Sequence, residues 1–86
     1  MLAIKRRPAL LARLGLSESA ADREIRDGFL PPPIRLSPDP ARRAVGWPEY
    51  EIEEIAAARV AGLGPDETRA LVADLIERRT RAREAA

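Results

Sequence analysis

The 86-residue sequence contains neither cysteine nor histidine. Without cysteine, the chain has no disulfide framework and no thiolate metal site, and nothing indicates an oxidising compartment. Without histidine, it lacks the commonest general base and a frequent zinc ligand. Its carboxylates are scattered without visible pairing, and no glycine-rich phosphate loop is present. We therefore expect no enzyme activity, no cofactor, no metal and no small-molecule substrate.

Long apolar runs are also missing. No stretch approaches the roughly 20 residues that a membrane helix needs. The basic segment Lys5-Arg6-Arg7 is followed by Pro8 and Arg13, which do not fit a signal peptide. We expect a cytoplasmic protein that has no membrane partner. The length limits the chain to a small core.

The net charge is only +1, which is low for a strong nucleic-acid binder. The distribution of the charges is more informative than their sum. Basic residues gather at 5–7, 35–43 and 78–83, whereas acidic residues gather at 49–54. Each cluster taken alone is also compatible with an ordinary solvated surface.

The segment 10–28 predicts two short helices joined by a tight turn. Leucines at helical spacing indicate a first helix over about 8–14, and Gly15 suits the left-handed conformation of a helix C-terminus. Ser17 is placed to cap a second helix over 17–27. Helix, short glycine turn and helix is the plan of a DNA-binding helix-turn-helix.

A proline-rich extended segment follows, because Pro31 to Pro33 cannot continue a helix. Residues 34–36 and 43–47 read as the strands of a small hairpin, joined by a loop at 37–42. The lead-in 1–7 is expected to be flexible or short and extended. A third helix begins at Pro48 and ends before 62–64. Its inner face is predicted to contain Ile52, Ile55, Ala56 and Val60, and Trp47 and Phe29 are predicted to be core residues.

A fourth helix begins at Pro65 and has an apolar stripe, formed by Leu71, Val72, Leu75 and Ile76. The stripe either folds back on the domain or meets a second copy. The other elements leave little spare apolar surface, which favours a homodimer or higher oligomer through 65–84. The predicted fold class is mainly α with a small β-hairpin. A winged helix-turn-helix domain at 1–62 is followed by a C-terminal helix at 63–86, for oligomerisation or packing.

A family resemblance extends over about 7–59. The matching residues are Leu14-Gly15-Leu16-Ser17, Arg23, Ile25, Gly28, Pro31-x-Pro33-Ile34-Arg35-Leu36, Val45-Gly46-Trp47 and Glu51-Ile52. In this order and spacing the chain resembles the AlpA-like phage regulators and excisionases, whose small winged-helix domain is related to the MerR type. The resemblance implies binding to duplex DNA and a role in transcription or prophage excision. The chain departs from the family's pattern at Ala21, Asp22 and Ile55.

The candidate DNA-contacting residues follow from this arrangement, in which the second helix enters the major groove. Helical rotation of about 100° per residue places them opposite Ala21 and Ile25. Arg23 can pair with guanine, and Asp22 can accept a hydrogen bond from cytosine N4. Ser17 and Ser19 can bind phosphate. The candidates are Ser17, Ser19, Asp22, Arg23 and Arg26 in the helix, and Arg35, Arg42 and Arg43 in the wing.

Several interpretations stay open. Lys5 to Arg7 can add a phosphate grip, and the wing arginines can follow the backbone or a narrow minor groove. Arg23 and Arg26 can instead pair with Asp22 and Asp27 on a solvated helix. The leading function is a sequence-specific DNA-binding regulator or an architectural excisionase-like factor. The alternatives are a small subunit of a phage DNA-packaging machine and a phage-encoded protein-interaction module. The acidic second helix and the low net charge favour the last.

Overall fold

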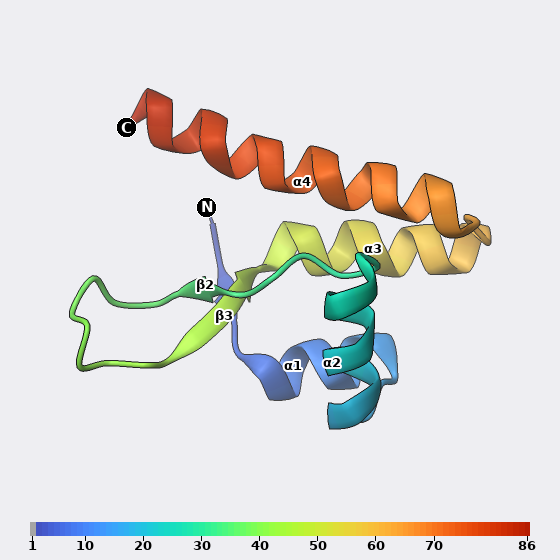
Figure 1. Cartoon of the computed structure of the whole chain (residues 1–86), viewed down its shortest axis with the longest axis horizontal. Helices are drawn as coiled ribbons and strands as arrows, with labels where there is room; N and C mark the ends of the chain where they lie inside the picture. Colours follow the sequence, from blue (N-terminus) through green and yellow to red (C-terminus); the bar gives the residue numbers. More distant parts are fainter. Residues whose placement is uncertain (1) are drawn as a thin grey trace.

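The computed structural model describes residues 2–86; of the expected lead-in, Met1 lies outside the described residues. The elements are β1 (Ile4–Lys5), α1 (Arg7–Leu14), α2 (Glu18–Asp27), β2 (Ile34–Arg35), β3 (Val45–Pro48), α3 (Glu49–Ala61) and α4 (Pro65–Ala85). In Figure 1, α3 and α4 run antiparallel, α1 lies on the other side of α3, and the β2–β3 loop projects away from the helices. The mainly helical fold class with a winged helix-turn-helix and a long C-terminal helix is confirmed.

The turn between α1 and α2 forms as the sequence predicts. Gly15 ends α1 in the left-handed region with φ 66°, a conformation that costs a residue without Cβ little. The Ser17 hydroxyl oxygen accepts a hydrogen bond from the main-chain N–H of Ala20 at 3.2 Å and so caps α2. The end of α1 and the start of α2 are therefore fixed by local chemistry.

The sheet has three antiparallel strands in the order β1-β3-β2, rather than the two of the expected hairpin. The lead-in supplies the additional strand, in which Ile4 pairs with Pro48 and Lys5 with Trp47. Gly46 permits this approach, because a Cβ at this position would lie 2.6 Å from the main-chain oxygen of Lys5. A two-residue strand has no alternating pattern, which is why the sequence does not reveal it.

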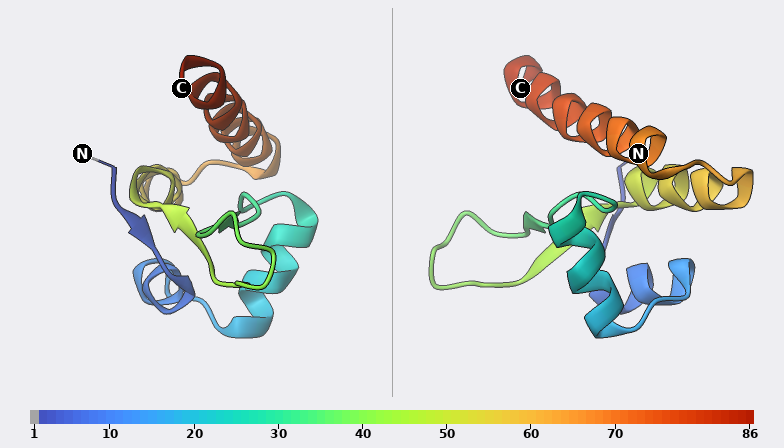
Figure 2. Two further views of the ribbon diagram at one scale, coloured as in Figure 1. Left: turned by 90° about the vertical axis from the view of Figure 1, so that its left-hand side faces the viewer. Right: turned by 45° about the vertical axis from the view of Figure 1, so that its right-hand side comes forward.

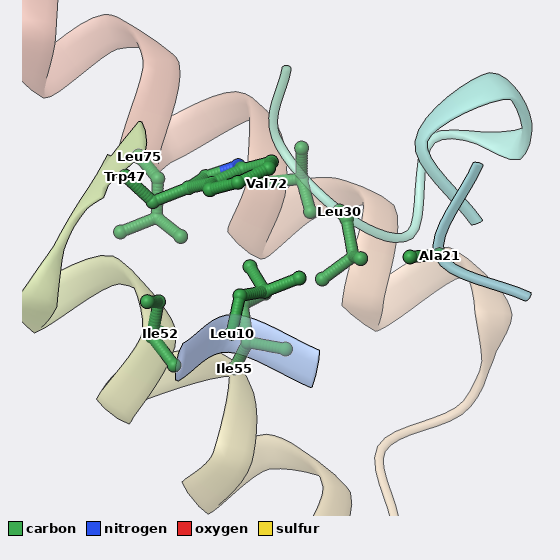
Figure 3. Packing of buried hydrophobic residues seen from close by; sticks show 8 residues of the cluster. All are labelled: Leu10, Ala21, Leu30, Trp47, Ile52, Ile55, Val72 and Leu75. Carbon is green, nitrogen blue, oxygen red and sulfur yellow. The ribbon is translucent and has the colours of Figure 1, made fainter. Parts of the chain in front are cut away.

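Trp47 lies at the centre of the core, as predicted. Its side chain is fully buried and its indole Nε1 donates a hydrogen bond to the main-chain oxygen of Pro31 at 2.8 Å. Figure 3 shows the indole among buried aliphatic side chains from α1, α3 and α4. The proline segment thus serves as a connector whose backbone satisfies the one polar atom of the indole.

The apolar stripe of α4 folds back on the same core. Val72 and Leu75 are buried in one cluster with Trp47 and Ile55. The expectation that the other elements leave little spare apolar surface was therefore wrong, since they leave a face that α4 covers. The outermost residue of the stripe, Ile76, is 39% exposed. Self-association through 65–84 stays a prediction.

Two arginine–glutamate pairs fasten α4 to α3. Arg79 donates to both carboxylate oxygens of the fully buried Glu51, at 2.7 and 2.6 Å. Arg78 donates to both oxygens of Glu54, at 2.6 and 3.1 Å. The hydrogen bonds from Arg78 to Glu54 and, next in size of effect, to Asp74 raise the pKa of Arg78 above its ordinary value. Acidic and basic clusters that are separate in the sequence thus meet across the helix pair.

Two predicted core positions were wrong. Val60 is 91% exposed and Ala58 is buried in its place. The cause is that α3 lies between α1 and α4 (Figure 2), so its inner face follows the contacts to both helices. Phe29 is only half-buried, and the guanidinium of Arg69 lies over its ring at 4.6 Å from the centroid.

Candidate nucleic-acid interface

The outward face of α2 is the one that the sequence predicts. Ala21 is fully buried and Ile25 is half-buried, so the opposite side of the helix faces solvent. Ser19, Arg23 and Arg26 all lie on this side and are exposed. The start of a capped helix and two arginines are thus presented together, as a major-groove helix requires.

The acidic residues of α2 are held by arginines of neighbouring helices. Arg7, the first residue of α1, pairs with Glu18 and with Asp22, each at 2.6 Å. Its pKa is raised above the ordinary value, chiefly by the hydrogen bond to Asp22 and next by that to Glu18. On the other side of α2, Glu24 pairs with Arg59 of α3. Most of the negative charge of α2 is therefore balanced within the domain.

The alternative in which Arg23 and Arg26 pair with Asp22 and Asp27 on a solvated helix holds for Arg26 only. Arg26 lies 3.6 Å from the carboxylate of Asp27 in an exposed pair, as that alternative expects. Asp22 binds Arg7, and among residues 2–86 Arg23 has no carboxylate within 4.0 Å. The guanidinium of Arg23 is consequently uncommitted in the described part of the chain.

The three wing arginines have different environments. Arg35 donates to main-chain oxygens of its own loop, the shortest of these bonds being 3.0 Å to Arg42, and so holds the loop closed. Arg42 is exposed and lies 3.8 Å from Asp39. Arg43 is exposed, and no carboxylate of residues 2–86 lies within ion-pair distance of it. Arg42 and Arg43 thus face solvent, whereas Arg35 shapes the wing that carries them.

The expected basic grip at 5–7 is mostly occupied by intramolecular pairs. Lys5 binds Glu49 at 3.2 Å and Arg7 binds the two acids of α2. In the described chain, Arg6 alone of these three has no such partner. A phosphate grip by Lys5 to Arg7 stays a prediction, but Lys5 and Arg7 are already bound to carboxylates that lie far away in the sequence.

Within residues 2–86, five arginines have no carboxylate oxygen within 4.0 Å: Arg6, Arg23, Arg35, Arg43 and Arg83. Arg23 belongs to the helix-turn-helix and Arg35 and Arg43 belong to the wing, whereas Arg6 directly precedes α1. The folded chain thus concentrates its uncompensated positive charge on and beside these two elements.

A comparison with protein families agrees with this geometry. The family model described as prophage CP4-57 regulatory protein (AlpA) matches residues 3–60. The chain belongs to the AlpA family. A search of curated proteins and a search of solved structures give no match. The AlpA match begins at the residue before β1 and ends near the end of α3, so α4 lies outside it.

As a member of the AlpA family, the chain is a regulatory protein. The AlpA family is not an enzyme family. In the described residues, no three acidic side chains are grouped so that they could hold a metal ion. None of the helices there is long and apolar enough to cross a membrane.

Sequence reasoning did not identify Arg7 and Arg59 as partners of α2. Each lies on another helix, 11 and 35 residues from the glutamate that it binds. One signal was available for Arg7, since Glu18 and Asp22 are four residues apart on one helix face and like charges at this spacing repel. A cation between them was to be expected, although not its position in the chain.

Proposed function

We propose that this chain is a sequence-specific duplex-DNA-binding regulator. In the proposed complex, α2 lies in the major groove with Arg23 and Asp22 at base edges. Ser17, Ser19 and Arg26 lie beside phosphates, and Arg42 and Arg43 follow the adjacent backbone or minor groove. Arg35 keeps the wing in shape, because it binds the loop's own carbonyl groups. Membership of the AlpA family supports this assignment.

One observation carries the proposal. Within residues 2–86, ten of the 15 basic side chains have carboxylate partners, and four of the five that have none lie on α2, in the wing or directly before α1. A surface that binds phosphates needs cations that are not already neutralised, because the counterions released from DNA drive binding. This distribution explains how a protein of net charge +1 can still bind a polyanion.

The test is fluorescence anisotropy of labelled duplexes across a salt series. Arg42→Ala/Arg43→Ala is expected to reduce the magnitude of the slope of log K against log salt by about 2. Arg81→Ala/Arg83→Ala removes the same charge from α4 and serves as the matched control, with affinity expected near that of the wild type. Arg23→Ala is expected to weaken binding to a preferred site more than binding to random DNA.

The outcomes separate the possibilities. If only the wing variant weakens binding, α2 does not read bases and the protein is an architectural factor of the excisionase type. Absence of binding to any duplex at low salt would refute the proposal. Equal losses in the wing variant and the α4 control would show that net charge, rather than this surface, determines affinity.

A protein-interaction module is the second candidate function. The observation that favours it is that Glu18, Asp22 and Glu24 keep α2 rich in acidic groups, although each is paired. This candidate predicts a chain that does not bind duplex DNA in the salt series. The same experiment therefore decides between the two functions.

A further inference from the structure

The guanidinium of Arg7 is placed between α1 and α2, beneath two carboxylates. Its Nε donates to Glu18 Oε2 at 2.6 Å, and its Nη2 donates to Asp22 Oδ1 at 2.6 Å and to the main-chain oxygen of Glu18 at 3.1 Å. The Arg7 side chain is 25% exposed, compared with about 70% for both acids. The cation is thus the inner member of the group and the carboxylates are the outer members.

This contact fixes the orientation of one carboxylate and leaves part of it available. Asp22 Oδ1 is bound to Arg7, and Asp22 Oδ2 has no hydrogen-bond partner among residues 2–86. A short side chain bound at one oxygen by a planar guanidinium loses much of its rotational freedom. The second oxygen can then accept only from a donor, and the major-groove donors are cytosine N4 and adenine N6. Cytosine suits a carboxylate better, because adenine also presents the N7 acceptor beside its amino group.

We infer that Arg7 is a positioning residue for base recognition, which holds Asp22 so that its free oxygen selects cytosine at one position of the DNA site. This inference rests on the proposed function, because it concerns how the same surface discriminates between sequences. Arg7 acts through Asp22 and does not itself contact DNA.

A role as a phosphate contact makes a different prediction. To reach a phosphate, the Arg7 guanidinium would have to give up hydrogen bonds to both acids, which would then repel each other and the DNA. Loss of a phosphate contact weakens binding to all sequences alike, whereas loss of base discrimination changes the preference at one position. The two roles therefore differ in a measurable way.

The experiment is selection from a pool of duplexes with a randomised central segment, followed by anisotropy on the enriched and the random duplexes. The full chain is compared with Arg7→Met, Asp22→Ala and the double variant. Arg13→Met is the matched control, because Arg13 also lies on α1 and binds a single glutamate with two bonds, but on the side facing α3. Circular dichroism during heating shows which variants are folded, and Arg7→Lys is added in case Arg7→Met does not fold.

The wild type is expected to prefer cytosine at one position by about 5-fold or more. Arg7→Met and Asp22→Ala should both reduce that preference to under about 2-fold at the same position, and the double variant should be no worse than either. Affinity for random duplexes should also fall in Arg7→Met, because Glu18 and Asp22 are left without their cation. The loss of the cytosine preference, and not this general loss, is the test of the inference. Arg13→Met should behave as the wild type. Arg7→Lys, which keeps the charge but not the planar fork, should also lose most of the preference.

Other results would overturn the inference. A uniform loss of affinity in Arg7→Met with the preference intact would make Arg7 a phosphate contact. A cytosine preference that survives Asp22→Ala would show that Asp22 does not read the base. A wild type that binds duplexes but enriches no sequence would overturn this inference and the claim of sequence specificity, whereas a wild type that binds no duplex would overturn the proposed function as a whole.

Discussion

Removal of the Arg79 guanidinium should destabilise the whole domain, although Arg79 lies outside the segment that matches the AlpA family. Arg79 binds both oxygens of Glu51, whose side chain has no exposed surface. In Arg79→Met the aliphatic stem is largely kept, and the buried carboxylate loses its cation. The expected decrease in the free energy of unfolding therefore comes from an uncompensated buried charge and not from lost packing.

The magnitude follows from the burial of the two partners. Breaking a fully buried pair by removing one partner costs about 3–5 kcal/mol. The Arg79 side chain is 19% exposed, so water can replace part of the lost interaction, and we expect a decrease in the free energy of unfolding of about 2–4 kcal/mol. For a domain of this size that decrease corresponds to a fall in Tm of roughly 10–25 °C.

The assay is urea unfolding monitored by the fluorescence of Trp47, which is fully buried in the core. Arg81→Met is the control on the same helix, because Arg81 makes only an exposed pair with Glu77, and a change below about 0.5 kcal/mol is expected. The double variant Glu51→Leu/Arg79→Met should recover much of the loss, since two apolar groups replace the two charges. A loss below about 0.5 kcal/mol in Arg79→Met would refute the reasoning.

Three further predictions follow from single contacts. Gly46→Ala should lower the free energy of unfolding by about 1–3 kcal/mol, because the added Cβ would lie 2.6 Å from the main-chain oxygen of Lys5. Chemical denaturation measures the loss of stability. An unchanged denaturation midpoint would show that β1 does not pack against Gly46. Ser17→Ala should cost about 1 kcal/mol through loss of the helix cap in the same assay, with Ser17→Asn expected to restore it. Finally, the hydrogen bond from Arg13 lowers the pKa of Glu53 below 4.5, so this pair stabilises the fold above that pH and the contribution is lost as the pH falls through the lowered pKa. An NMR titration should show Glu53 moving back towards 4.5 in Arg13→Met, and an identical titration in both proteins would contradict the pair.

The helical part of the fold could be predicted because its determinants are local. Gly15 and Ser17 act within one turn of chain, and their geometry is what the sequence indicates. Trp47 could be placed in the core because a lone aromatic residue directly before a helix start usually packs against the domain. The exposed side of α2 also follows directly from helical periodicity, given Ala21 on the inside.

The parts that could not be predicted depend on residues distant in the sequence. Lys5 and Arg7 read as a basic cluster until the fold places Glu49 and Asp22 beside them. Val60 fits the spacing of an amphipathic helix. However, the contacts of α3 with α1 and α4 bury a different side of the helix, which contains Ala58, and Val60 lies on the exposed side. In the candidate interface, the sequence therefore indicates which residues are exposed and not which of their charges are already neutralised.

The burial of Val72 and Leu75 in the central core limits which segments of the chain can be exchanged by recombination. The part of this chain that matches the AlpA family cannot be exchanged independently of α4, because a recombination event that replaced the segment after Gly62 would leave Trp47 and Glu51 without their cover. Acceptable replacements would have to bring an apolar pair and a matching cation at the same spacing. Positions 51 and 79 are thus expected to change together over evolutionary time, or not at all.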